Sequence, residues 1–480
     1  MASITNDVID VLVKTGLLES NGSGGVIPGL RKVTDASGNT VLVGPDGVIP
    51  RALGSNVITV GDGGDFTDIA DAIDYRNTVH QHTLAHTTTC TITGSSSGTV
   101  DVRTITLASA FSAYAATRTA SYGVQINNAG PIIPVRLYSD TLVLLPYPIT
   151  QDFAAGTPIK IYELKRASIF VLPGNQLILS AHDDMTFPAY TTLAGIPGTS
   201  EIIKRSSSVG SLFVTDDTFN QSRITGLRLV DDYHGINSIF FNMNKGAGNN
   251  SLVPMADFEF DNNDVVTTSN DVLYCITPGG IGLNVHDNKM KGTFDVLRFS
   301  THRKVLVYDN DIDIEASSFL DNDNPAGVVL GATSAWDYAW QTYEVRNNHI
   351  KCVDFPTQYA SSKASATGVD IRNPISSAAD VIVVGNTIDV EVVAGTGAGW
   401  TIGTESATGI KVGPLATGTN TPTIVVKDNN VRAAVSGGNT TTPTIAKSSN
   451  ANYVIKTAGN SVFGGGATAL GANTAALTTY

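Results

Sequence analysis

One pattern of apolar and polar positions returns along the second half of the chain. Two apolar residues separated by one position are followed by two variable residues, an Asn, one further residue and another apolar residue. Six copies are complete and a seventh is degraded, with Asn spacings of 25, 22, 38, 38, 43 and 31 residues. The repeated residues are Asn263, Asn288, Asn310, Asn348, Asn386, Asn429 and Asn460.

The alternation places the apolar residues on the inner face of a short strand. The Asn follows at a turn, where its side chain tolerates left-handed backbone geometry and bonds to the backbone. If the strands stack coil on coil, the Asn side chains also bond to one another as a ladder of satisfied polar groups. The sequence therefore predicts an all-β fold in which the repeats form a parallel β-helix.

A second strand repeats within each copy. The segment from each Asn to this strand is 8, 7, 17, 20 and 23 residues long, whereas the return segment stays between 15 and 21 residues. Insertions therefore accumulate at one corner of the solenoid, where they form either a binding face or an oligomer contact. The second strands are expected at 271–273, 295–297, 327–329, 368–371 and 409–412.

Upstream of the repeats, residues 61–66 form a glycine- and aspartate-rich turn before a short amphipathic helix, which Thr67 can cap. A solenoid exposes an apolar end, so we expect this helix to cover it. The turn lacks the Lys-Ser/Thr ending of a phosphate loop. Alternating apolar runs then predict a β-rich insert. The expected divisions are an adaptor segment (1–55), a capping strand and helix (56–83), the insert (84–165), the β-helix (166–463) and a C-terminal tail (464–480).

The glycine-aspartate turn, its helix and the Asn-punctuated coils together resemble the pectin-lyase-like right-handed parallel β-helices of phage tailspikes. Residues 1–55 add a short N-terminal helix and a hairpin at 33–47 that ends in a Gly-Pro turn. They are similar to the adaptor segments that attach tail fibres and spikes to the virion. The resemblance implies a homotrimer in the virion, bound to phage tail or baseplate proteins through its N-terminus. Its ligand would be a host surface glycan, which such proteins sometimes cleave.

Three functions remain open from the sequence. The first is a tailspike that binds host polysaccharide, with or without endoglycosidase or lyase activity. The second is a structural virion protein, such as a capsid decoration or a tail collar. The third is a cellular polysaccharide lyase or hydrolase, against which the missing signal peptide counts, because its substrate would lie outside the cell.

The composition of the chain argues against nucleic acid as a binding partner and against membrane insertion. Only 15% of residues are charged, 42% are apolar, and the net charge is -13. With no Lys/Arg cluster to release counterions, nucleic acid is disfavoured. The first residues lack a basic region and no run of 18 apolar residues exists, so we expect synthesis in the host cytoplasm and no membrane insertion. Cys275 and Cys352 lie in apolar strand-like runs and are expected to be buried thiols. No cofactor is expected.

Candidate catalytic residues follow from the repeat. Glycoside hydrolysis commonly needs two carboxyl groups about 5–5.5 Å or about 6.5–9.5 Å apart. Coils of a stacked solenoid lie about 4.8 Å apart, so residues two coils apart are separated by roughly 9.6 Å. The cluster could bind a glycan or hold an acid/base pair, or it could be an outward polar row produced by strand alternation. Its members are Asp313 and Asp389 at one offset after the Asn, Glu315 and Glu391 at another, and Asp354.

Other candidates lie elsewhere in the chain. Trp336, Tyr338 and Trp340 share one strand face and could stack on sugars or pack in a core or trimer seam. Residues 231–234 (Asp-Asp-Tyr-His) read as a site on an early coil or as a turn. His80, His82 and His86 alternate, but they have no nearby Cys or firm carboxylate partner, so no metal site is expected.

Overall fold

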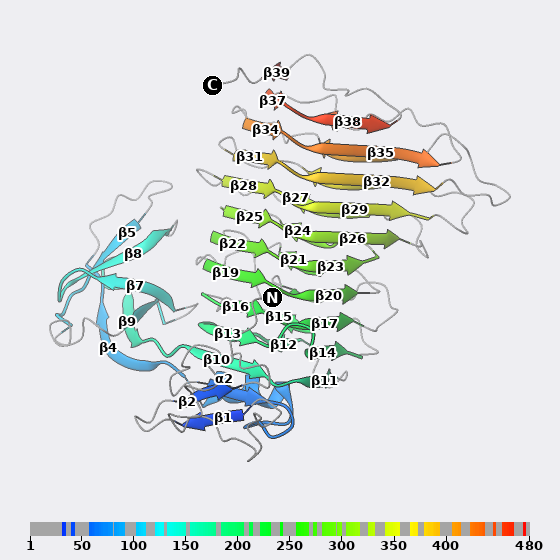
Figure 1. The fold of residues 1–480 in the computed structure, drawn as a ribbon. Helices are drawn as coiled ribbons and strands as arrows, with labels where there is room; N and C mark the ends of the chain where they lie inside the picture. The colour runs from blue at the N-terminus through cyan, green and yellow to red at the C-terminus, as the bar shows by residue number, and fades with distance from the viewer. Residues whose placement is uncertain are drawn as a thin grey trace, which may run out of the picture.

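The computed structural model of the 480-residue chain (Figure 1) describes 26 separate stretches of it. These are residues 31–34, 40–43, 57–79, 81–91, 102–111, 121–128, 132–149, 154–178, 184–205, 211–214, 221–231, 241–242, 256–267, 272–275, 281–293, 295–299, 304–316, 325–331, 341–355, 365–372, 379–393, 406–413, 423–436, 445–447, 454–464 and 474–476.

The described residues form a parallel β-helix, as the repeat predicts, and each complete coil contributes one strand to each of three parallel sheets (Figure 1). The twelve-stranded sheet contains β3 (Val57–Val60), β10 (Ala167–Val171), β13 (Thr191–Ala194), β16 (Arg223–Thr225), β19 (Ala256–Asp261), β22 (Ile281–His286), β25 (Lys304–Tyr308), β28 (Gln341–Arg346), β31 (Ala379–Val384), β34 (Thr423–Lys427), β37 (Val454–Ala458) and β39 (Thr474–Ala476).

The repeated Asn residues lie where each coil passes from the twelve-stranded sheet to the ten-stranded sheet. The ten-stranded sheet contains β11 (Gly174–Ile178), β14 (Ser200–Lys204), β17 (Arg228–Asp231), β20 (Asp264–Thr267), β23 (Lys289–Gly292), β26 (Asp311–Ala316), β29 (His349–Asp354), β32 (Thr387–Val393), β35 (Asn430–Ser436) and β38 (Ser461–Gly464).

The second repeated strand of the sequence becomes the nine-stranded sheet. It contains β12 (Met185–Thr186), β15 (Phe213–Val214), β18 (Phe241–Asn242), β21 (Leu273–Cys275), β24 (Leu297–Phe299), β27 (Ala326–Leu330), β30 (Ser365–Ile371), β33 (Ser406–Val412) and β36 (Ile445–Lys447). The connections that lengthen along the sequence join the ten-stranded sheet to this one, from Thr267 and Leu273 in an early coil to Val393 and Ser406 in a late one.

One continuous core runs through the coils. Alternation turns every second residue inward, and parallel pairing stacks equivalent residues, as in the row Leu283, Val305 and Tyr343. The core extends from Ile58 near the base to Ile455 near the C-terminal end, and most of its members are fully buried. Each coil therefore depends on its neighbours to cover its apolar face.

The seven Asn side chains form a continuous ladder, which is buried except at its last member, the half-buried Asn460. In each step the Nδ2 group donates to the Oδ1 of the next Asn at 2.9–3.1 Å, and the backbone N–H of the same residue donates to that oxygen as well. The left-handed conformation lies one residue earlier than the sequence reading placed it. The residues with positive φ are Asn262, Asp287, Asp309, Asn347, Gly385, Asp428 and Gly459. Asp, Asn and Gly are the residue types that tolerate this geometry.

Helix α2 (Ile69–Thr78) covers the base of the solenoid with Ile69, Ala72 and Ile73, which join the core. Its N-cap is Asp68 rather than the expected Thr67, because the Asp68 carboxylate accepts the Ala70 N–H at 2.7 Å. Among the described residues, no helix has the length and apolarity needed to cross a membrane.

Arg76 attaches this helix to the first coils. Its side chain is 3% exposed, and it donates to Thr191 Oγ1 at 3.1 Å, to the Lys165 carbonyl at 2.9 Å and to the Ala189 carbonyl at 3.1 Å. Burial lowers the pKa of Arg76 to about 10. The guanidinium therefore serves as the shared donor for several backbone acceptors at the cap.

Replacing Arg76 with Met should lower the free energy of unfolding by about 3 kcal/mol, because the buried acceptors lose their donor. Urea unfolding followed by circular dichroism measures this change. Arg228→Met is the matched control, since Arg228 is exposed on β17 and pairs with Glu201 at 3.0 Å; its loss should stay within about 1 kcal/mol. Equal losses in the two variants would contradict the role given to Arg76.

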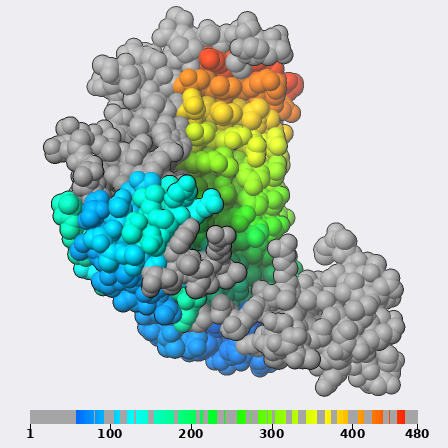
Figure 2. All heavy atoms as spheres, turned by 90° about the vertical axis from the view of Figure 1, so that its left-hand side faces the viewer, coloured from blue at the N-terminus to red at the C-terminus, as the bar shows by residue number. Residues whose placement is uncertain are grey.

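The insert is a separate antiparallel sheet with its own core, which includes Ile105, Val124 and Ile161. It stands against the lower half of the coil stack (Figure 2), and the Tyr190 hydroxyl donates to the Ile132 carbonyl across the contact. Its strands are β4 (Thr83–Thr89), β5 (Val102–Thr106), β6 (Tyr122–Ile126), β7 (Ile133–Leu137), β8 (Leu142–Ile149) and β9 (Pro158–Glu163).

Part of the N-terminal segment is also described. β1 (Arg31–Thr34) pairs antiparallel with β2 (Thr40–Val43), which gives a hairpin within the expected adaptor. The helix expected near the N-terminus lies outside the described residues. Cys90 and Cys352 are buried free thiols, and the side chain of Cys275 lies outside the described residues.

Candidate functional site

Three carboxyl groups are buried in two coils: Asp295 precedes β24, and Asp354 and Asp370 belong to β29 and β30 of the coil two further along. Asp354 ends β29, and strand alternation turns it inward after Ile350 and Cys352. Its register partners in the neighbouring coils are the buried apolar residues Ala316 and Val392. A carboxyl group thus occupies an apolar row of the core and is only 2% exposed.

This environment changes the acidity of Asp354. Burial raises its pKa to about 7, against a hydrogen bond from the backbone N–H of Ser365. Its Oδ1 atom is buried and has no hydrogen-bond partner among the described residues. Burial also raises the pKa of the neighbouring Cys352 thiol, with the charges of Asp354 and Asp295 adding to the effect. The Cys352 thiol therefore stays protonated, whereas Asp354 changes its charge near neutral pH.

Arg372 joins the other two carboxyl groups, Asp295 and Asp370. Asp295 precedes β24 and Asp370 lies on β30, two coils further along. Arg372 Nε donates to Asp370 Oδ2 at 2.6 Å, and Arg372 Nη2 lies 3.9 Å from Asp295 Oδ2. Burial raises the pKa of Asp295 against the positive charges of Arg372 and Arg298. The Arg372 side chain is 35% exposed, so it connects the buried carboxyl groups to solvent.

The sequence predicted Asp354 but missed Asp295, Asp370 and Arg372. Alternation gave no signal for Asp370, because it stands between the inward residues Val369 and Ile371, just as the outward Asp313 stands between two inward residues. A buried carboxyl group needs a partner, and Arg372 follows two residues later. We refer to Asp295, Asp354, Asp370 and Arg372 as the corner cluster.

The other predicted carboxylates lie on the outward face of the ten-stranded sheet. The pairing register stacks Asp313, Lys351 and Asp389 in neighbouring coils, so the two aspartates are two coils apart, as the repeat indicated. Asp313 lies 3.5 Å from Lys351 Nζ, and Asp389 lies 3.1 Å from Arg432 Nη1. Glu315 lies 3.4 Å from Lys291 Nζ, and Glu391 accepts from Ser436. Their assignment as catalytic groups stays a prediction.

The remaining candidates are only partly visible. Trp336, Tyr338 and Trp340 lie outside the described residues, as do Asp232, Tyr233 and His234. Asp231 is buried at the end of β17. His82 and His86 lie at the base of the insert, where His82 accepts from the Lys165 N–H and packs edge-on to Tyr190; His80 lies outside the described residues.

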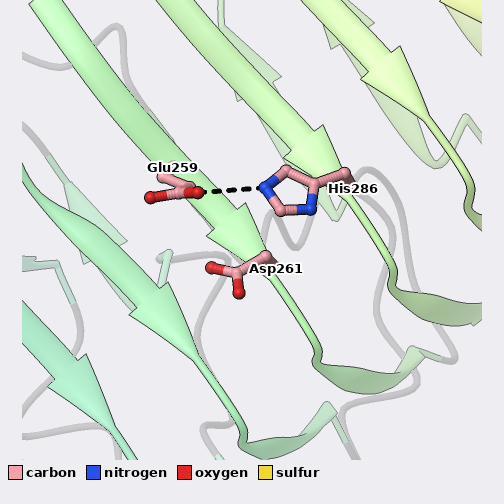
Figure 3. A group of neighbouring side chains, drawn as sticks. All are labelled: Glu259, Asp261 and His286. Atoms are coloured by element: carbon pink, nitrogen blue, oxygen red, sulfur yellow. Dashed lines mark hydrogen bonds and ion pairs between the residues drawn. The ribbon is translucent and has the colours of Figure 1, made fainter.

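A second group of titratable side chains lies on the outward face of the twelve-stranded sheet (Figure 3). One oxygen each from Glu259 and Asp261 and one ring nitrogen of His286 lie within 4.8 Å of one another. His286 Nε2 is 3.0 Å from Glu259 Oε1, and His286 Nδ1 is 2.8 Å from Asp287 Oδ2. Carboxylate and imidazole are ligands that divalent metals accept.

The cation at this group is supplied by the protein itself. Arg223 donates to both oxygens of Asp261 at 2.6–2.7 Å, and its Nε lies 3.5 Å from Glu259. Burial would raise the pKa of Asp261, but the hydrogen bonds from Arg223 and Asn262 outweigh it and hold that pKa low. Asp261 is therefore already neutralised and hydrogen-bonded without a metal.

The same group continues along the sheet as a stacked column. Burial would lower the pKa of His286, but its hydrogen bonds with Asp287 and Glu259 raise it above the usual value. The imidazole stacks on the Tyr308 ring at 4.6 Å, and Arg346 lies over that ring at 4.8 Å. These contacts join successive coils through charge and aromatic stacking, which indicates a role in holding the coils together.

Comparisons with known proteins give similar solved structures, among them a tailspike and a glucanase, and no family. No family model matches the chain, and no curated protein matches it. The tailspike gp61 of Pseudomonas phage phi297 aligns with 81% of this chain and 64% of its own, at 10% identity and a TM-score of 0.35. The catalytic domain of a GH87 alpha-1,3-glucanase aligns with 83% of this chain and 90% of its own, at 10% identity and a TM-score of 0.20. The aligned region thus spans just under two thirds of the tailspike chain.

Proposed function

We propose that this protein is a phage tailspike that binds host surface polysaccharide and cleaves its glycosidic bonds at the corner cluster. The observation that carries the proposal is a group of buried carboxyl groups with raised pKa at the corner where the connections between sheets lengthen. Perturbed carboxyl groups of this kind are typical of acid–base catalysis. The resemblance of the Asn-punctuated coils to tailspikes supplies the class of ligand.

The shape of the solenoid suits a polymer. Outward side chains repeat from coil to coil at a spacing of about 4.8 Å, so a chain of sugars lying along the axis meets equivalent positions repeatedly. In the proposal the N-terminal segment attaches the protein to the phage tail or baseplate, and three copies form the spike. The aromatic residues Trp336, Tyr338 and Trp340 remain proposed sugar-stacking positions.

The chemistry assigned to the corner cluster follows from its charges. Asp354 keeps its proton up to about neutral pH, so it can donate that proton to a departing glycosidic oxygen. A second carboxyl group, from Asp295 or Asp370, takes the role of base or nucleophile. Arg372 is the one described residue of the cluster that reaches solvent appreciably, so we place the sugar against its guanidinium. The buried carboxyl groups must become accessible when the polymer binds.

The test is the release of reducing ends from capsule or lipopolysaccharide of the host strains. Asp354→Asn and Asp295→Asn should each lower the rate roughly 10²- to 10⁴-fold, because each removes a proton-transfer group. Asp311→Asn is the matched control, since Asp311 is the exposed first residue of β26, at the other end of that strand from Ala316, the register partner of Asp354; its variant should stay within about twofold of the wild type.

A separate binding assay distinguishes the parts of the proposal. Retained binding of the polysaccharide by wild type and variants, without any release of reducing ends, would remove the catalytic part and leave the spike. Absence of binding across the host strains would favour the structural virion protein. Electron micrographs of labelled particles would then place the protein on the capsid or at the tail.

A further inference from the structure

The charges on the outward face of the ten-stranded sheet follow a rule that runs from strand to strand. Each of eight successive strands, β14 to β35, carries outward side chains of one sign only, and the sign alternates at every step. The acidic strands carry Glu201 on β14, Asp264 on β20, Asp311, Asp313 and Glu315 on β26, and Asp389 and Glu391 on β32. The basic strands carry Arg228 on β17, Lys289 and Lys291 on β23, His349 and Lys351 on β29, and Arg432 on β35.

The alternation resolves into two columns that the pairing register defines. The first runs through Glu201, Arg228, Asp264, Lys289, Asp311 and His349. The second runs through Lys291, Asp313, Lys351, Asp389 and Arg432. Within both columns every carboxylate directly faces a basic residue on its neighbour, with His349 carrying a charge only when it is protonated.

The geometry shows that these neighbours interact. Glu201 lies 3.0 Å from Arg228, and Asp311 lies 2.8 Å from His349 Nδ1. In the second column Lys351 is 3.5 Å from Asp313, and Arg432 is 3.1 Å from Asp389. Most of these side chains are 37–56% exposed, so each pair contributes only about 0–1 kcal/mol to stability. The stability that individual ion pairs contribute therefore does not explain the alternation of charge on this face.

The apolar rows and the Asn ladder do not specify the order in which the coils stack. The coils from Phe258 onward share similar inward apolar rows and a ladder Asn, so these features alone distinguish a neighbouring coil from a non-adjacent one only weakly. Stacked repeats commonly misassemble in this way. The charge columns distinguish the two cases, because skipping one coil places Asp313 against Asp389, or Lys351 against Arg432. Like charges directly opposite one another on a sheet are destabilising.

We propose that the strand-by-strand alternation of charge fixes the order of the coils during folding, by making every pairing that skips one coil repulsive. Each such pairing opposes at least one like-charged pair, and pairing β26 with β32 opposes two, Asp313 with Asp389 and Glu315 with Glu391. The long connections between the ten- and nine-stranded sheets, such as the one between Val393 and Ser406, give a coil room to be skipped. In the proposal the outward charges specify which coil pairs with which, because the inward apolar residues do not.

The test compares refolding yields of variants at Asp389. Asp389→Lys makes the skipped pairing with Asp313 attractive and the correct pairing with Lys351 repulsive, whereas Asp389→Asn only removes the charge. At low ionic strength we expect the Lys variant to refold to native protein with a yield several-fold below the Asn variant. The difference should disappear at about 0.5 M NaCl, where charges are screened over a few ångströms.

A full inversion of the second column provides the rescue. The variant with Lys291→Glu, Asp313→Lys, Lys351→Glu, Asp389→Lys and Arg432→Glu keeps every neighbour in that column opposite in sign. Its yield should return to within about twofold of the wild type. Urea unfolding of the native fractions separates a low yield from a loss of native stability. Equal yields for the Lys and Asn variants, or an inversion that refolds as poorly as Asp389→Lys, would overturn the proposal.

Discussion

Replacing Asn348 with alanine is expected to lower the free energy of unfolding by about 4 kcal/mol. Asn348 is 1% exposed, and its Oδ1 accepts from the backbone N–H of Asn310 at 3.0 Å and from Asn310 Nδ2 at 2.9 Å. Its Nδ2 donates to the Val307 carbonyl at 3.0 Å and to Asn386 Oδ1 at 3.0 Å. The substitution leaves several buried polar groups unpaired, each at a cost of about 1–3 kcal/mol.

Urea unfolding followed by far-ultraviolet circular dichroism measures this loss. Asn430→Ala is the matched control, because Asn430 is the exposed first residue of β35 and stands outside the ladder; it should change stability by less than about 0.5 kcal/mol. A loss below about 1 kcal/mol for Asn348→Ala would mean that the ladder contributes little. The same substitution at Asn460, the half-buried end of the ladder, should have an intermediate effect, since fewer partners are left unpaired.

The stability of the protein should fall by about 4 kcal/mol between pH 4 and pH 8 because of Asp354 alone. Its pKa is about 7 in the folded protein against about 3.9 in an unfolded chain, so the unfolded state gives up its proton first as the pH rises. The stability that the protonated group contributes is complete below about pH 4 and is lost as the pH rises through 7. The cause is the burial of the carboxyl group between Ala316 and Val392.

Asp354→Asn should remove this dependence. The amide keeps the acceptor for the Ser365 N–H and carries no charge, so the variant should match the wild type near pH 4 and exceed it by several kcal/mol at pH 8. Unfolding midpoints measured across this pH range, with Asp311→Asn as the control on the exposed face, give the comparison. Parallel curves for wild type and Asp354→Asn would show that Asp354 is not buried as described. The result does not depend on the proposed catalytic role.

Local pattern was sufficient for the architecture because the β-helix is nearly one-dimensional. Each coil contacts only its neighbours, so the spacing between Phe258, Phe260 and Asn263 already specifies a strand, a turn and the next strand. The sequence reading was wrong on finer points, where geometry of one residue decides. Asp68 rather than Thr67 caps the helix, and the residue before each ladder Asn adopts the left-handed conformation.

The candidate site was predictable only in part. Asp354 was identified from its place after the ladder Asn, together with four carboxylates that proved to lie on the outward face. Strand alternation alone separates them, because Asp313 and Asp389 stand at odd offsets from the inward residues, whereas Asp354 continues the inward series of Ile350 and Cys352. Counting this offset would have placed Asp354 in the core.

The sequence by itself determined the coil, its inward rows and its Asn ladder, since all of these repeat with the chain and need only neighbouring coils. Tertiary structure alone decided that Asp295, Asp370 and Arg372 gather at one corner. Asp295 lies two coils before Asp370 and Arg372, and the connections between them differ in length, so no fixed spacing along the chain relates Asp295 to the other two. Features that recur in every repeat can be predicted from the sequence. Contacts between residues separated by connections of unequal length depend on how the coils stack.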